Sequence, residues 1–171
     1  IMDLALESMR DVREGMVEAG FIAVFCGIES TNLDVLKRMR KGQNKGDLEQ
    51  SVQTLQRAGL EVTAGFIVGN DDDTEAVFDE LHAFIQRTGI VIPMPGLLTA
   101  LRGTRLYKRL SEEGRLREES LGNNTHRFRF NFEPVLDETF LIEGYVTLLE
   151  RLFSSKQYFA RARRLIKRRG Q

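Results

Sequence analysis

GFIVGNDDDT, residues Gly65 to Thr74, reads as a buried strand that ends in a glycine turn and leads into a helix with an acidic start. Two other segments have a similar design: Gly27-Ile28-Glu29-Ser30 lies upstream and Leu97-Leu98-Thr99-Ala100 lies downstream. α/β enzymes bind their cofactors at the carboxyl ends of strands, in the turns that lead into the following helices. The sequence therefore predicts a series of β/α units whose strand ends line one site.

The composition is that of one ordinary globular domain. The chain has 171 residues, 42% of them hydrophobic, and its 25 basic residues balance 25 acidic ones. This balance gives no overall attraction to nucleic acid or to anionic membranes. The single cysteine, Cys26, excludes a disulfide framework or a cysteine metal cluster formed by this chain alone. Because no apolar run approaches the ~20 residues of a membrane helix and no secretory signal is visible, we expect a cytoplasmic protein.

Apolar periodicity predicts alternating helices and strands over the first two thirds of the chain. Helices are expected at residues 4–18, 33–39, 47–58, 73–87 and 103–114, and strands at 21–28, 60–68 and 90–98. The first strand is apolar at odd and even positions alike, which predicts that both of its faces are covered. Pro93 and Pro95 predict that the third strand is an edge strand or irregular. Alternation of this kind predicts parallel strands joined by right-handed crossovers.

The last 50 or so residues follow a different pattern. Phe128, Phe130 and Phe132 alternate with polar residues that include Asn131, which predicts a half-buried strand or an extended arm. A helix capped by Asp137 is expected to cover 141–153, and a final helix 155–169. We therefore predict two parts: an α/β part at residues 1–116 and an α-helical extension at 117–171.

Polar residues and glycines at the strand ends are the candidate site residues. Glu29 follows a buried strand, where a carboxylate either binds a polar ligand or belongs to a helix-capping turn. Gly65 and Gly69 either let a flat ligand lie against the backbone or form a tight turn. The turn alone accounts for Gly69 but poorly for Gly65.

Other charged and reactive residues favour structural roles. Asp71, Asp72 and Asp73 do not match a calcium loop, and acids at the start of a helix are favoured by the helix dipole. Cys26 falls within a buried strand, while His82 falls in a helix and His126 in a polar loop, so we expect no catalytic role for them. A basic cluster near the carboxyl terminus favours a cationic helix end over a nucleic-acid site. That cluster comprises Arg161, Arg163, Arg164, Lys167, Arg168 and Arg169.

Several segments in order resemble the later half of a radical S-adenosylmethionine (SAM) barrel. They are Gly27–Ser30, Leu36–Lys41, Gly65–Gly69 followed by Asp73-Thr74, Thr99–Tyr107, and Glu113–Leu116. The chain is most similar to the cobalamin-binding branch, which includes hopanoid methylase-like proteins with a helical carboxyl-terminal domain. The resemblance implies a partial (β/α)6 barrel in which the three strands of this chain are the fourth, fifth and sixth. The expected fold is therefore an α/β half-barrel with three parallel strands and an α-helical extension.

The resemblance also implies part of a SAM-binding site, with no catalytic residue and no metal ligand in this chain. Glu29 and Ser30 would face the ribose and methionine of SAM, and Lys41 would pair with its carboxylate. The Gly65-x-Ile67-x-Gly69 stretch would pack along the adenine. Asp73 stands where the family has a glutamate. The last members of the implied site are Leu98, Thr99 and Ala100, which would offer backbone groups to the adenine edge.

By the same resemblance, the complete enzyme would be an iron–sulfur oxidoreductase or methyltransferase acting on a small-molecule substrate. It would cleave SAM reductively with a [4Fe-4S] cluster and, in this branch, bind cobalamin. The three-cysteine cluster loop is not in this sequence, so we expect the chain alone to be inactive. Its implied partner is the amino-terminal half-barrel, without which the strand at 21–28 would expose an edge and self-associate. Two alternatives remain open: a small α/β domain that binds a phosphorylated ligand at the Gly69 turn, and a non-enzymatic interaction module that uses the basic helix.

Overall fold

The computed structural model describes residues 9–38, 47–118 and 128–169. Three strands form one parallel sheet in the order β1-β2-β3: β1 (Ala23–Glu29), β2 (Glu61–Val68) and β3 (Pro93–Leu97). Seven helices lie before, between and after the strands in these ranges. They are α1 (Arg10–Glu18), α2 (Leu33–Arg38), α3 (Leu48–Arg57), α4 (Val77–Thr88), α5 (Arg105–Glu112), α6 (Glu138–Phe153) and α7 (Ser155–Arg169). The predicted fold class, α/β with three parallel strands and carboxyl-terminal helices, is confirmed.

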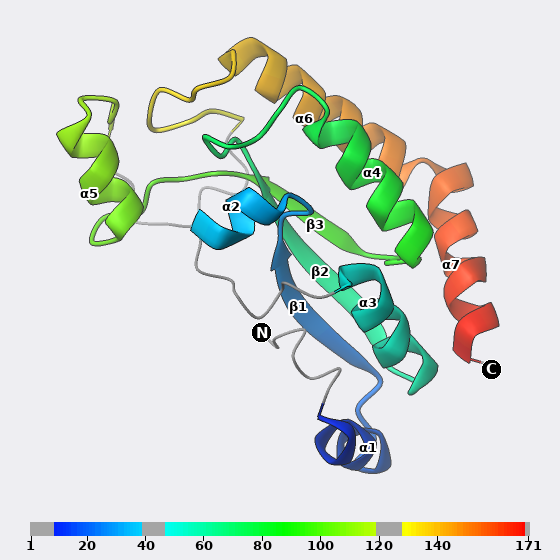
Figure 1. Ribbon diagram of the computed structural model, residues 1–171. Coiled ribbons are helices and arrows are strands. Elements are labelled where there is room, and N and C mark those ends of the chain that lie inside the picture. The colour runs from blue at the N-terminus through cyan, green and yellow to red at the C-terminus, as the bar shows by residue number, and fades with distance from the viewer. Residues whose placement is uncertain (1–8, 39–46, 119–127, 170–171) are drawn as a thin grey trace.

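Most helices gather on one side of the sheet (Figure 1). Helix α3 contacts β2, α6 contacts β3 and α4, and α7 contacts α3, α4 and α6. The last two helices therefore pack on the β/α units as an additional layer, with α7 outermost (Figure 1). Successive side chains of a strand point to opposite faces of a sheet, so only one face meets these helices.

The other face of the sheet is only partly covered. In β2, the side chains of Val62, Ala64, Phe66 and Val68 are buried, whereas the residues between them are half-buried. The register pairs the half-buried residues of β2 with Phe25, Gly27, Met94 and Gly96, of which only Gly27 is buried. We call this side the open face; it comprises Phe25, Thr63, Gly65, Ile67, Met94 and Gly96. The expectation that β1 is covered on both faces is contradicted only in part by the described residues, because Phe25 is half-buried whereas Gly27 on the same face is buried.

Several local predictions are confirmed. β3 is an edge strand, as Pro93 and Pro95 indicate, and β1 forms the opposite edge. Asp47 and Asp137 cap α3 and α6, where their carboxylates accept hydrogen bonds from the backbone N–H groups of Gln50 and Phe140. A cap of this kind satisfies an N–H group that has no partner within the helix.

Two local predictions are wrong. Helix α4 begins at Val77 rather than at Asp73, and its N-cap, Ala76, makes no side-chain cap. The arm at residues 128–132 does not alternate between inside and outside, because Asn131 is buried together with Phe130 and Phe132. An antiparallel bridge between Leu116 and Phe132 holds this arm against the end of the β/α part.

Candidate binding site at the carboxyl ends of the strands

The end of β1 is a strained turn. Glu29 has a φ of 70°, and it is the only non-glycine residue with a positive φ in the described ranges. The N–H of Ser30 donates to the carbonyl of Ile28 at 2.9 Å, so Glu29 is the central residue of a three-residue turn. A turn of this type with positive φ is rare and strained. A bulge between Gly27 and Glu29 accompanies it, and this bulge aims the end of β1 away from the regular ladder.

The turn into α2 continues this structure. The Oγ of Ser30 accepts a hydrogen bond from the N–H of Asn32 at 3.0 Å. The Oδ1 of Asn32 accepts from the N–H of Asp34 at 2.8 Å, and its Nδ2 donates to the carbonyl of Asp72 at 3.0 Å. Asn32 therefore joins the turn after β1 to the turn after β2.

The end of β2 is closed by Asp73. Its Oδ2 accepts hydrogen bonds from the N–H groups of Gly69 and Asn70, both at 2.8 Å. Its Oδ1 is buried and has no hydrogen-bond partner among the described residues. Burial raises the pKa of Asp73 above its ordinary value, and the hydrogen bonds to the ionised form offset this only in part. Asp73 thus belongs to the turn that follows the strand, and not to the first turn of α4.

Asp71 and Asp72 also do not interact with the start of α4, because arginines from other elements bind them. Asp71 accepts from Arg109 at 2.6 Å and from Arg115 at 2.8 Å and 3.2 Å. Asp72 makes a two-point pair with Arg38, at 2.5 Å and 2.7 Å. Burial would raise the pKa of Asp71, but the hydrogen bonds and charges of Arg115 and Arg109 outweigh it, and the pKa is lowered. The predicted dipole role of these two acids is wrong because arginines of α2 and of the α5 region bind them instead.

The end of β3 is held by a buried amide. The N–H of Leu98 still donates to the carbonyl of Val68 at 2.8 Å, which extends the ladder past the end of β3. The side chain of Asn131 then pairs with both backbone groups of Ala100, each at 2.9 Å. An adenine edge that binds the backbone of Ala100 would therefore have to replace Asn131.

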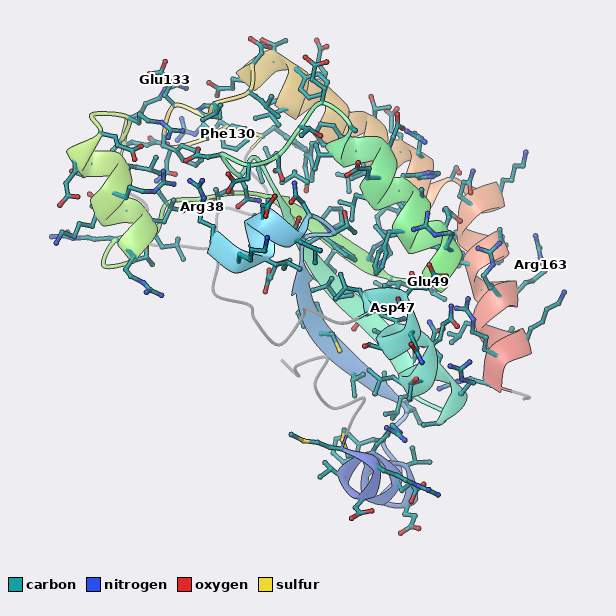
Figure 2. All side chains as sticks on the ribbon, in the orientation of Figure 1. Arg38, Asp47, Glu49, Phe130, Glu133 and Arg163 are labelled. Atoms are coloured by element: carbon teal, nitrogen blue, oxygen red, sulfur yellow. The ribbon has the colours of Figure 1, made fainter. Side chains whose placement is uncertain are left out.

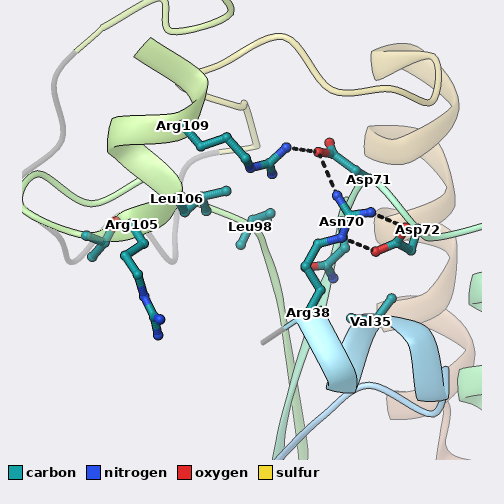
Figure 3. A pocket seen from close by; sticks show the side chains of 10 residues that line it. Val35, Arg38, Asn70, Asp71, Asp72, Leu98, Arg105, Leu106 and Arg109 are labelled. Atoms are coloured by element: carbon teal, nitrogen blue, oxygen red, sulfur yellow. Dashed lines mark hydrogen bonds and ion pairs between the residues drawn. The ribbon is translucent and has the colours of Figure 1, made fainter. Parts of the chain in front are cut away.

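A cavity of about 440 Å³ lies between these strand ends, α2 and α5 (Figure 3). Its lining comprises Val35, Arg38, Asn70, Asp71, Asp72, Leu98, Thr104, Arg105, Leu106 and Arg109. Three guanidinium groups and two carboxylates give it a mostly charged wall, with Val35, Leu98 and Leu106 as the apolar part. A lining of this kind suits a small ligand that carries both polar and apolar groups.

The structure distributes the predicted site residues over two neighbouring places. Leu98 lines the cavity, and Gly69 and Asp73 form the turn next to it. Gly65 and Ile67 lie on the open face, where the ring of Phe25 approaches the missing Cβ of Gly65 to within 3.2 Å. Glu29, Ser30, Thr99 and Ala100 lie at the strand ends but do not line the cavity. Lys41 lies outside the described residues, as does His126.

Sequence reasoning missed four residues that build the site. Arg109 and Arg115 hold Asp71, Asn131 holds Ala100, and Phe130 packs where Gly69 has no side chain. Phe130 and Asn131 lie in the extension, so the proposed boundary at 116/117 separates residues that contact each other; the boundary itself stays a prediction. Three consecutive acids at residues 71–73 could have indicated a basic partner elsewhere in the chain. Nothing in the local sequence indicated Asn131.

Most arginines of the basic cluster on α7 donate hydrogen bonds to other parts of the protein. Arg168 donates to Gln56 Oε1 and to the carbonyls of Arg87 and Thr88, and Arg164 donates to the carbonyl of Gln86. Arg169 donates to the carbonyls of Ile22 and Gly59. Arg161 is fully buried and donates to Val91 and Leu152. Most of these carbonyl groups lie at the ends of α3, α4 and α6, where the helix dipole favours a positive charge, whereas those of Ile22 and Val91 lie just before β1 and β3.

The remaining reactive residues have structural surroundings. Cys26 is fully buried in the core, and His82 contacts Arg151 through Nδ1 at 3.1 Å. Within the described ranges, no three His, Cys, Asp or Glu side chains are grouped so that they could hold a metal ion. None of the helices that the structure describes is long and apolar enough to cross a membrane.

Sequence comparisons relate the chain to methyltransferases. It is 34% identical over 153 residues to an uncharacterized methyltransferase of Synechocystis, which is 89% of this chain and 28% of that protein. It is 38% identical over 107 residues to the hopanoid C-2 methylase of Rhodopseudomonas palustris, covering 62% of this chain and 20% of that protein. A bacteriochlorophyllide d C-12(1)-methyltransferase of Chlorobaculum tepidum is 29% identical over 153 residues, covering 88% of this chain and 33% of the relative.

The comparisons also match residues 104–171 to a domain of unknown function, DUF4070. This match begins at the N-cap of α5 and runs to the end of the chain. The chain spans a third or less of the length of the relatives described above. The expected similarity to methylases is confirmed at this level: the chain resembles one part of several larger methyltransferases.

Proposed function

We propose that this chain is the later half of the barrel, with its helical extension, of a SAM-dependent methyltransferase of the cobalamin-binding radical SAM type. Its three strands would be the last three of a (β/α)6 barrel, and its strand ends would form one wall of the SAM site. The similarity to methyltransferases over 89% of the chain supports the reaction class. The order of the barrel-like segments along the sequence supports the branch.

The observation that carries this proposal is the open face of the sheet. A barrel packs helices on its outer face and closes around its inner face, which matches a sheet with most of its helices on one side. Gly27, which is buried, pairs with Gly65, and Gly96 pairs with Ile67 two residues further along β2. A flat group can approach the backbone closely at positions without side chains, and at Gly65 it would take the place of the ring of Phe25, which lies 3.2 Å from an added Cβ. The adenine of SAM is such a group, and Ile67 would lie beside it.

The residues present do not fit an iron–sulfur cluster. A cluster needs several thiolates, and Cys26 is one thiol, fully buried in the core. We therefore assign no step to a cluster in this chain. In the proposed whole enzyme, the cluster and cobalamin would be bound by the amino-terminal part, which is also the proposed partner of the open face. The chain alone is expected to be inactive.

The two alternative functions are less well supported. A phosphate at the Gly69 turn would need the N–H groups of Gly69 and Asn70, and the carboxylate of Asp73 already occupies both. An interaction module based on the whole basic cluster would need arginines that instead bind carbonyls inside the protein. Neither alternative explains the glycines on the open face.

The test is SAM binding measured by calorimetry on the chain alone and on the chain joined to the amino-terminal half of a related methyltransferase. We expect no micromolar binding by the chain alone and clear binding by the joined protein. Gly65→Leu should abolish that binding, because its side chain would occupy the space of the adenine.

Glu61→Leu is the matched control, since Glu61 lies on the same strand with the same facing, at the far end from the site. It should leave SAM binding within about twofold of the parent value. Micromolar binding by the chain alone would contradict the proposed division of the site. Equal SAM binding by the Gly65→Leu variant and its parent would contradict the proposal that the adenine packs against β2 at Gly65.

A further inference from the structure

Helix α7 has two faces that use their cations differently. The helix carries seven basic and no acidic residues, whereas the whole chain carries 25 of each sign. The inward arginines, Arg161, Arg164, Arg168 and Arg169, donate to backbone carbonyls. These contacts fix the helix on α3 and α4, and they therefore also fix the direction in which its other face points.

The other face, which we call the outer stripe, comprises Lys156, Phe159, Arg163, Ile166 and Lys167. At 100° per residue, these five positions fall within about 100° of the helix circumference. All five are exposed, with Phe159 at 56% and Ile166 at 69%. Among the described residues, none forms an ion pair or hydrogen bond with the three cations. Figure 2 shows Arg163 extending away from the rest of the molecule.

The composition of the outer stripe indicates the kind of partner. Two large apolar side chains alternate with three cations along one helix face, and this is the pattern of helices that lie in the plane of a membrane interface. There the apolar side chains enter the boundary between headgroups and acyl chains, while Lys and Arg contact anionic headgroups. A nucleic acid would also attract the cations, but single strands are bound mainly by cations and by stacking on aromatic side chains, in which an aliphatic side chain such as Ile166 takes no part.

The position of α7 in the fold agrees with such a role. The helix lies at the outer side of the helical layer, while β1 and α5 lie toward the opposite side (Figure 1). A flat surface could therefore contact α7 without covering the strand ends. We propose that the outer stripe of α7 binds an anionic lipid surface and holds the protein peripherally on it. This inference does not depend on the function proposed above.

The test is flotation of the full 171-residue chain with vesicles of phosphatidylcholine alone or with one third phosphatidylglycerol. We expect binding only to the anionic vesicles, and its loss between about 0.05 M and 0.5 M salt. The Lys156→Gln, Arg163→Gln, Lys167→Gln triple variant should weaken binding by roughly fivefold or more per cation removed. The Phe159→Ser, Ile166→Ser double variant should weaken it at least tenfold at low salt, where the charges are intact.

The matched control removes three other exposed cations, Lys37, Arg57 and Lys108, from α2, α3 and α5. It has the same net charge as the first triple variant, so it should bind anionic vesicles like the parent chain. An equal loss of vesicle binding in both triple variants would overturn the proposal, because it would indicate that binding depends only on the net charge of the chain. Failure of the parent chain to bind anionic vesicles would overturn it, as would tighter binding to single-stranded RNA than to the vesicles.

Discussion

The turn after β2 brings Gly69 against an aromatic ring from a distant part of the chain. The φ of Gly69 is 96°, and an added Cβ would lie 2.7 Å from Cζ of Phe130 and closer still to Cε1. Two separate costs therefore oppose a side chain here: the left-handed backbone and the ring. Gly103 shares only the first cost, because its φ is 83° and no atom lies within 4 Å of an added Cβ.

We expect Gly103→Ala to lower the free energy of unfolding by about 1–2 kcal/mol, which is the backbone term. Gly69→Ala should lower it by roughly 3 kcal/mol or more, since overpacking against Phe130 adds about 1–3 kcal/mol. Urea titration followed by circular dichroism measures both values. Equal losses in the two variants would mean that Phe130 does not pack on this turn.

Asp71 gives the turn a dependence on pH. Burial would raise its pKa, yet Arg115 and Arg109 lower it below the ordinary value of about 3.9. A lowered pKa in the folded state means that the stabilisation is complete above pH ~4 and is lost as the pH falls through the folded-state pKa. Asp71→Asn should therefore be less stable than the parent near pH 7, and this gap should narrow below pH ~4.

The measurement is the urea midpoint of parent and variant from pH 3 to pH 7. Asp11→Asn, which changes an exposed acid on α1, controls for the loss of one charge. A gap between parent and Asp71→Asn that stays constant over this range would show that the ion pairs with Arg109 and Arg115 do not stabilise the fold.

At the scale of elements, α7 acts as a clamp on the ends of α3 and α4. Arg168 is its best-connected residue, with 2.8 Å contacts to Gln56 Oε1 and to the carbonyl of Arg87. Hydrogen bonds from charged donors each contribute more than neutral ones. Arg168→Ala should lower the free energy of unfolding by roughly 2 kcal/mol.

Arg163→Ala is the control for this prediction, because it removes the same side chain from the exposed face of the same helix. It should change the free energy of unfolding by no more than about 0.5 kcal/mol. Thermal unfolding of both variants gives the comparison. If the two variants lose the same stability, α7 does not clamp the helix ends through Arg168.

The sequence predicted elements well because their signals are local. Apolar periodicity and the capping residues Asp47 and Asp137 depend on neighbours within one or two turns, and these predictions agree with the structure. The interpretation of the three acids did not, because the partners of Asp71 lie 38 and 44 residues away. The alternation at residues 128–132 predicts a half-buried strand or arm but not the burial of Asn131, for the same reason: its partner, Ala100, is 31 residues away. The site was thus predictable as a set of strand ends, but not as a network of contacts.

At the scale of the whole molecule, the apolar character of β1 exceeds what the described structure buries. Val24, Cys26 and Ile28 are buried against the helices, yet Phe21 and Ile22 just before the strand are 54% and 76% exposed. β1 is also an edge of the sheet. A strand edge with exposed apolar residues pairs readily with another chain. In the proposed whole enzyme the neighbouring barrel strand would cover it, and in the isolated chain a second copy would take its place.

We therefore expect the isolated chain to self-associate with rising concentration, measured by light scattering. Ile22→Lys should shift this association to at least tenfold higher concentration, because a charged residue at an edge opposes pairing with another strand. Val135→Lys is the control: Val135 is 63% exposed but lies in the segment before α6, away from the sheet edge. If the parent chain stays monomeric, the edge of β1 is not a contact surface. The same conclusion follows if Val135→Lys weakens self-association as much as Ile22→Lys does.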